Sequence, residues 1–308
     1  MAVLILQSAN SGSSSRWIFD CIEGVRAWAT AKRHHYRFLD DDFFKPVPTA
    51  IVEKLAGHSQ SAIILSDLAR LHWCRHFLSL GYERVVWLDA DVLVFAPDLF
   101  DLPSEAMSGK APRVEAPLEE APLEEALSQQ SEFEQALAPL NGSYEHSGFC
   151  RWGCHVGREH WLEASAKDTE TRRDEGGESV SLAHLRVRSK LHNAFLSFSK
   201  GSPLLDFYLQ ASTELLLQQQ GNHIPAQFVG PKLLSALHRL SYFPVFDGVG
   251  MISPRLLQAL MENDQKVLRF FKSQGFCAFH AANLCSSLQR QTLDIDQIAT
   301  RCRAAFSV

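Results

Sequence analysis

The chain has 308 residues, of which 46% are hydrophobic and 21% charged, which is enough apolar material to bury a full α/β core. Its formal net charge of −5 at pH 7 argues against a nucleic-acid-binding protein, because such proteins present a basic face to the phosphates. The first residues lack the basic n-region of a signal peptide, and no stretch reaches the roughly eighteen apolar residues of a membrane span. We therefore expect a cytoplasmic protein without a transmembrane segment, at most peripheral to a membrane.

The first part of the chain predicts two strands around a helix. Residues 3–7 form a short apolar run, a loop rich in turn-forming residues follows, and a helical pattern extends to about residue 32. A strand that ends in a small-residue loop leaves room for a nucleotide, which makes Gln7 and Ser8 candidate substrate contacts. Residues 36–39 predict the next strand, and the acidic run at residues 40–42 is interpreted as its solvated end, a weaker candidate for a metal site.

The next unit is a helix followed by a strand that carries two carboxylates. Ser66 opens a segment with leucines near helical spacing, and Gly81 ends it. The strand reads Val-Val-Trp-Leu-Asp-Ala-Asp-Val-Leu-Val-Phe, and alternate residues of a strand share a face. Asp89 and Asp91 should therefore point to one side at the carboxyl end of the strand, where they could bind a divalent cation. A capped turn and a solvated carboxylate are the alternative.

Asp67 and Arg70 lie three residues apart, so they share one face of the helix near its predicted amino terminus. Two interpretations are open. The pair is either a surface salt bridge worth under about 1 kcal/mol, or part of a ligand site.

The remaining segments predict further helices and one insertion. Residues 102–142 contain the repeat Glu-Ala-Pro-Leu-Glu and predict an acidic insertion broken by proline, and residues 143–185 are a candidate acceptor-side region. Helices are expected over residues 204–219 and 231–240, from Ser253, and over 293–306. The seven cysteines are irregularly spaced and predict reduced thiols; a zinc site at Cys150, Cys154, His146 and His155 fits no strong zinc pattern.

Ser-Asp-x-x-Arg, then Gly-Tyr, Leu-Asp-x-Asp-Val and Pro-x-Leu, resembles the donor-binding core of retaining glycosyltransferases of the A-type fold that carry a DXD motif. These include capsular-polysaccharide, mannosyl and glycogenin-like transferases. Later pieces resemble the same family in the same order: residues 192–209, Gly230-Pro231, and Phe279-His280 with Asn283 and Ser286. The resemblance implies an α/β fold, with a mostly parallel central sheet flanked by helices, as one glycosyltransferase domain over residues 1–308.

The resemblance also implies an activity, which is transfer of a hexose from a UDP- or GDP-sugar to a glycan, lipid-linked or protein acceptor, with retention of configuration. It implies Mn²⁺ or Mg²⁺, because hard oxygen ligands suit these ions. By residue, it implies a cation bound by Asp89, Asp91 and His280, a catalytic centre of Asp67, Arg70 and Asn193, and donor contacts from Asp67, Arg70, Asp89, Asn283 and Ser286.

Two other classes of protein stay open. Leu-Asp-Ala-Asp-Val-Leu also approximates the signature of haloacid-dehalogenase-like phosphatases, in which Asp89 would be the nucleophile and Asp91 the general acid. A sugar-nucleotide-binding protein without catalytic activity is the third possibility.

Overall fold

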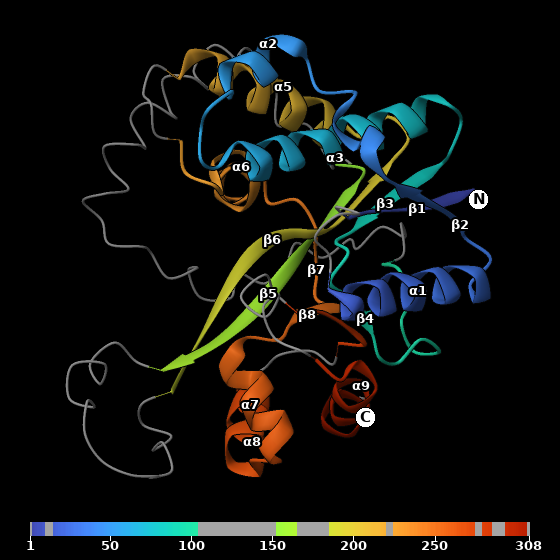
Figure 1. Ribbon diagram of the computed structural model, residues 1–308, viewed down its shortest axis with the longest axis vertical. Helices are drawn as coiled ribbons and strands as arrows, with labels where there is room; N and C mark the ends of the chain where they lie inside the picture. The colour runs from blue at the N-terminus through green and yellow to red at the C-terminus, as the bar shows by residue number, and fades with distance from the viewer. Residues whose placement is uncertain are drawn as a thin grey trace.

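The computed structural model describes residues 2–9, 15–103, 152–164, 185–219, 224–274, 279–284 and 293–306 (Figure 1). Helices cover a central sheet on both sides, which confirms the predicted α/β class. The acidic repeat, Cys150, His146 and Ser286 lie outside the described residues.

The main sheet is mixed, with strand order β2-β1-β3-β6-β5-β7. Strands β2, β1 and β3 are parallel, whereas β6 runs antiparallel to both β3 and β5. A second sheet has the order β4-β9-β8. The mostly parallel arrangement that was predicted thus holds for β2, β1 and β3 and for the pairing of β5 with β7. The strands are β1 (Val3–Ser8), β2 (His35–Leu39), β3 (Arg84–Leu88), β4 (Val92–Val94), β5 (Cys154–Ala164), β6 (Leu185–Ser199), β7 (Val245–Phe246), β8 (Val249–Met251) and β9 (Ala281–Asn283).

The helices form two groups (Figure 1). One contains α2 (Thr49–Lys54), α3 (Ser61–Ser79), α5 (Pro203–Gln218) and α6 (Leu233–Ser241), and the other contains α1 (Arg16–Ala31), α7 (Pro254–Glu262), α8 (Gln265–Ser273) and α9 (Ile295–Phe306). Most predicted helices are confirmed, including the one that Ser253 caps by accepting a hydrogen bond from the Leu256 amide. Two differ: α3 begins at Ser61, ahead of Ser66, and Gly230-Pro231 lie in a π-helical turn, Phe228–Lys232, before α6.

Both faces of β1 and β3 are buried, as their nearly continuous apolar sequences predict, whereas the edge strand β2 has exposed residues. In β3, Val85 and Trp87 belong to the core beneath α3 and α5, and Val86 and Leu88 belong to the core beneath α1. The alternation along β3 therefore directs Trp87 toward α3. The acidic residues that follow β2 are exposed, and Asp40 caps the short 3-10 helix Asp41–Phe44. This agrees with their interpretation as a solvated strand end.

Pro103 and Trp152, the described residues on either side of 104–151, lie near the start of β3. The Pro103 carbonyl accepts a hydrogen bond from Arg84 Nη1 at 2.6 Å, and the Trp152 carbonyl accepts one from Ser202 Oγ at 2.8 Å. Arg84 pairs with Ser199 across the sheet, and the Ser199 amide donates to the Gly153 carbonyl. The two described ends are therefore close together, at the end of β3 opposite to Asp89.

The described cysteines, Cys21, Cys74, Cys154 and Cys302, are free and buried, in line with the predicted thiols. Burial raises the pKa of the Cys154 thiol far above its usual value. Within the ranges that the structure describes, no helix combines the length and apolar character that a membrane span requires.

Candidate functional site

The two carboxylates lie where the first parallel strands end, but not on one continuous strand. Strand β3 stops at Leu88, and Asp89 and Asp91 occupy the turn to β4, which the Val92 amide closes by donating to the Asp89 carbonyl at 3.2 Å. The prediction of two alternate strand positions was wrong in this respect. Both residues are partly exposed, and the location at the carboxyl edge of β3 agrees with the expectation.

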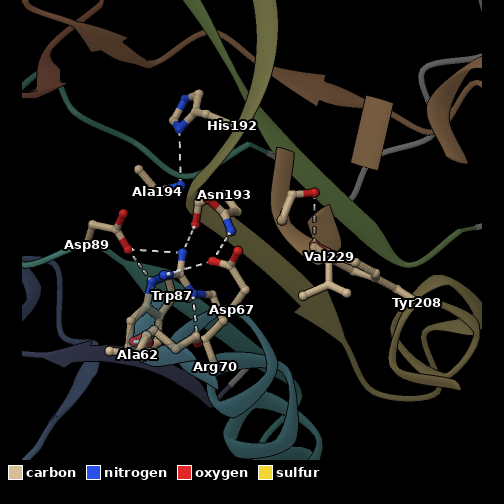
Figure 2. A network of polar contacts seen from close by, with 12 residues as sticks. Ala62, Asp67, Arg70, Trp87, Asp89, His192, Asn193, Ala194, Tyr208 and Val229 are labelled. Carbon is tan, nitrogen blue, oxygen red and sulfur yellow. Dashed lines mark hydrogen bonds and ion pairs between the residues drawn. The ribbon is translucent and has the colours of Figure 1, made fainter. Parts of the chain in front are cut away.

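Arg70 joins three elements in a buried polar network (Figure 2). Its Nη1 donates to the Asn193 carbonyl at 2.8 Å and lies 3.2 Å from Asp89 Oδ1, and its Nη2 lies 3.4 Å from Asp67 Oδ1. Asn193 Nδ2 donates to Asp67 Oδ1 at 2.7 Å. Asp67 is 4% exposed and Arg70 8%, so the surface salt bridge is excluded. The early start of α3 places this pair inside the helix, on its sheet-facing side.

A tryptophan that sequence reasoning missed completes this network. Trp87 Nε1 donates to Asp89 Oδ1 at 2.7 Å, and the Arg70 guanidinium lies 5.2 Å from the centre of a Trp87 ring. The signal was present in the sequence, because Trp87 precedes Asp89 by only two residues where the strand ends.

Gly230 lets the turn before α6 approach the network closely. A Cβ added at this glycine would stand 2.2 Å from Asp67 Oδ2 and 3.0 Å from Asn193 Nδ2, so any side chain would displace both groups. The turn is held in place by Tyr208, whose hydroxyl donates to the Val229 carbonyl at 2.7 Å. Glycine at position 230 is thus required by packing against Asp67.

The site carries more negative than positive charge. Burial raises the pKa of Asp67 to about 6 against the opposing effects of Arg70 and Asn193, and burial together with Asp89 raises the pKa of Asp91 to about 7. The positive charge of Arg70 acts in the opposite direction and lowers the pKa of both carboxyl groups. His192 does not add charge at neutral pH, because burial lowers its pKa to about 4. Three carboxyl groups therefore share one guanidinium, and the raised pKa values leave Asp67 and Asp91 partly protonated near neutral pH.

Gln7 supports the backbone of the site. It is fully buried, and its Nε2 donates to the Asp89 carbonyl at 3.0 Å while its Oε1 accepts from the Tyr36 hydroxyl at 3.0 Å. These contacts place Gln7 beneath Asp89 and not on a ligand-facing surface. Ser8, the last residue of β1, is partly exposed next to it.

Strand β9 brings Asn283, but not His280, to the acidic pair. Asn283 pairs with Val92, and the next amide, from Leu284, donates to the Asp91 carbonyl at 3.0 Å. The His280 carbonyl instead accepts from the amide of Phe95 at 3.2 Å, about 10 Å farther along the strand. This separation follows from the antiparallel pairing of β9 with β4.

The described residues contain no group of three or more His, Cys, Asp or Glu side chains suited to holding a metal ion. The three-ligand set implied by the resemblance, with His280 beside Asp89 and Asp91, is therefore not assembled. Two carboxylates remain as candidate protein ligands.

A second polar cluster lies on β5. Arg158 Nε and Nη2 donate to the two carboxylate oxygens of Asp247 at 2.7 and 2.6 Å, and His160 Nε2 lies 3.8 Å from Asp247 Oδ1. Burial acts to raise the pKa of Asp247, but the hydrogen bonds from His160 and Arg158 outweigh it and lower the pKa to about 2. This carboxylate is ionised at neutral pH, and it joins β5 to the end of β7.

No family model and no curated protein matches the chain. Among solved structures, the chain is similar to a glycosyltransferase involved in the glycosylation of the major capsid of PBCV-1, with 10% sequence identity and a TM-score of 0.40 over 98% of this chain and 100% of that one. It is also similar to mouse xyloside xylosyltransferase 1 in its apo form, with 9% identity and a TM-score of 0.39 over 93% of this chain and 99% of that one. Because both TM-scores are low, we base the assignment of function on the residues of the site.

Proposed function

We propose that this protein is a cation-dependent glycosyltransferase of the A-type fold, which transfers a hexose from a UDP- or GDP-sugar with retention of configuration. The observation that carries the proposal is the buried Asp67–Arg70–Asn193 network, which ends on Asp89 at the carboxyl edge of β3. A costly buried charge network at the place where α/β sheets bind ligands is typical of a functional site. It also combines the carboxylate and guanidinium groups that recognise sugar hydroxyls.

The burial of each residue suggests how the roles divide. Asp89 has 25% of its side chain exposed, against 9% for Arg70 and 5% for Asp67. We assign Asp89 to direct contact with the donor, because it is the most accessible of the three. Arg70 lies directly behind it, and Asp67 and Asn193 hold the guanidinium in place. In this assignment the contact between Asp67 and the hexose that the resemblance implied becomes an indirect one.

The residues present fit a divalent cation. Three carboxyl groups share a single guanidinium here, so a bound divalent cation would offset the negative charge that they carry when ionised, and carboxylate oxygens are suitable ligands. We assign Asp91 as the main protein ligand, since Oδ1 of Asp89 already accepts from Trp87 and faces Arg70. When bound, such a cation supplies Lewis-acid stabilisation of a diphosphate leaving group.

The same contacts weigh against the phosphatase alternative. A pKa of about 7 would suit Asp91 as a general acid. However, Asp89 would have to be the nucleophile, and its Oδ1 is stabilised by an indole N–H and a guanidinium, which reduce the reactivity of a carboxylate. Asp89 also follows the third strand of the chain, whereas the phosphatase signature follows the first.

One assay separates the three functions. The purified chain is incubated with UDP- and GDP-hexoses and Mn²⁺, and nucleoside diphosphate release, thermal shift and hydrolysis of p-nitrophenyl phosphate are measured. Asp98→Asn serves as the control, because Asp98 is exposed and outside the network. Donor turnover supports the proposal. Phosphate release alone would indicate a phosphatase, a selective thermal shift without turnover would indicate a binding protein, and either result would contradict the proposal.

A further inference from the structure

We propose that Trp87 is a positioning residue of this site, and that its indole N–H and ring hold Asp89 and Arg70 in the arrangement that binds the cation and the donor. This inference rests on the proposed function for the identity of the ligands. The contacts themselves are made by described residues. Of the three residues involved, the sequence had indicated Asp89 and Arg70 but not Trp87.

The carboxylate of Asp89 needs an external constraint. Asp89 lies in a turn beyond the end of β3, so its side chain is not packed in the sheet. Two donors from different elements meet at its Oδ1, which are Trp87 Nε1 at 2.7 Å and Arg70 Nη1 at 3.2 Å. The indole contact is the shorter one. Arg70 alone would attract the carboxylate toward α3 and Asp67, whereas Trp87 holds it at the edge of the sheet.

Trp87 is itself firmly fixed. It is 2% exposed, and its strand is paired on both sides, with Leu6 of β1 and Leu196 of β6 opposite Trp87. Phe43 stacks on the indole with ring centres 5.4 Å apart. A donor on such a rigid strand can define the orientation of a neighbouring carboxylate to the accuracy that ligand binding needs.

The ring has a second role. The Arg70 guanidinium lies 5.2 Å from the centre of a Trp87 ring, within the range of a cation–π interaction. The same side chain therefore contacts both members of the Arg70–Asp89 pair. Loss of the N–H should disturb Asp89 and leave Arg70 on an aromatic face, which allows the two roles to be tested separately.

The experiment compares Trp87→Phe with Trp28→Phe. Trp28 is a matched control, because it is 1% exposed and its Nε1 donates to the Phe100 carbonyl at 2.9 Å in the core beneath α1. Both variants lose one indole N–H and the same volume. We expect similar falls in melting temperature, but only Trp87→Phe should weaken Mn²⁺ binding, measured by electron paramagnetic resonance, and lower kcat/KM for the donor, each by about tenfold or more.

A second variant removes only the N–H. Replacement of Trp87 by the analogue with sulfur in place of the indole nitrogen keeps the ring and its volume, so it tests the hydrogen bond even if Trp87→Phe does not fold. It should show the same loss of Mn²⁺ affinity. Wild-type Mn²⁺ affinity in this variant, or equal effects in Trp87→Phe and Trp28→Phe, would overturn the inference. A wild-type protein that binds Mn²⁺ in a Trp87-dependent way without turning over any sugar nucleotide would refute the proposed function alone.

Discussion

Replacing Arg70 by lysine should destabilise the protein far more than the same change at a surface ion pair. The Arg70 guanidinium reaches Asp89, the Asn193 carbonyl and Asp67 at the same time, and the side chain is 8% exposed. A lysine ammonium is a single point and cannot span these three acceptors. At least two contacts to charged or buried acceptors are lost, and each is worth roughly 1.5–3 kcal/mol.

The expected cost in the free energy of unfolding is therefore about 3–6 kcal/mol, which overlaps the range of about 3–5 kcal/mol for breaking a buried ion pair by removing one partner. For a domain of this size, this corresponds to a fall of roughly 10 °C in melting temperature. Denaturant unfolding and thermal unfolding followed by circular dichroism measure both quantities. Adding Asp67→Asn in a double-mutant cycle should give a coupling energy above about 1 kcal/mol.

Arg26→Lys is the matched control. Arg26 also pairs with an acidic residue three positions earlier, Glu23, at 3.0 Å, but these side chains are 48% and 63% exposed. We expect a change within about 0.5 kcal/mol there. If Arg70→Lys proves as mild as Arg26→Lys, Arg70 does not hold the network together and the reasoning from burial is refuted.

Three other regions allow independent tests. Gly230→Ala should lower the free energy of unfolding by about 1–3 kcal/mol, because its Cβ would overlap a carboxylate. Gly24→Ala, with no atom within 4 Å of the new Cβ, should instead stabilise α1 by about 0.5–1 kcal/mol. A loss of stability below this range in Gly230→Ala would contradict the close packing. Because the pKa of Asp247 is lowered to about 2, it should contribute about 2 kcal/mol above pH 4, lost as the pH falls from 4 to 2. Denaturant unfolding between pH 4 and 2 should show a weaker dependence of stability on pH in Asp247→Asn than in the wild type. The same pH dependence in both proteins would contradict the lowered pKa of Asp247. Replacing residues 104–151 by a short Gly/Ser linker should leave the melting temperature and donor turnover nearly unchanged, because the flanking residues Pro103 and Trp152 lie close together at the end of β3 opposite to the carboxylates. Loss of soluble folded protein would show that the segment is part of the core.

The sequence predicted local features of the site better than its long-range contacts. The three-residue spacing of Asp67 and Arg70 placed both on one helix face, and the apolar run before Asp89 placed that residue at a strand end. The burial of Asp67 and Arg70 depends on where α3 begins, and the leucine spacing did not determine that residue. The contact with Asn193 depends on the register between β3 and β6, and no local pattern encodes pairing across that much intervening chain.

The direction of β9 also determines which residues near the end of the chain lie beside the carboxylates. The resemblance indicated that His280, Asn283 and Ser286 would approach the carboxylates together. Because β9 runs antiparallel to β4, Asn283 lies beside the acidic turn and His280 lies toward the other end of β4. The sequence of β9 alone is a short apolar strand without a signal for its direction. Ser286 lies outside the described residues and stays a prediction.

The most direct test of the account is the cation dependence of donor turnover in the wild type and in Asp91→Asn, with Asp98→Asn as the exposed control. We expect wild-type turnover of a UDP- or GDP-hexose to require Mn²⁺ or Mg²⁺ and to stop in excess chelator. Asp91→Asn should lose most turnover while remaining folded, and Asp98→Asn should behave as the wild type. Full turnover in excess chelator, or in Asp91→Asn, would contradict the assignment of the acidic turn as the centre of a cation-dependent glycosyltransferase.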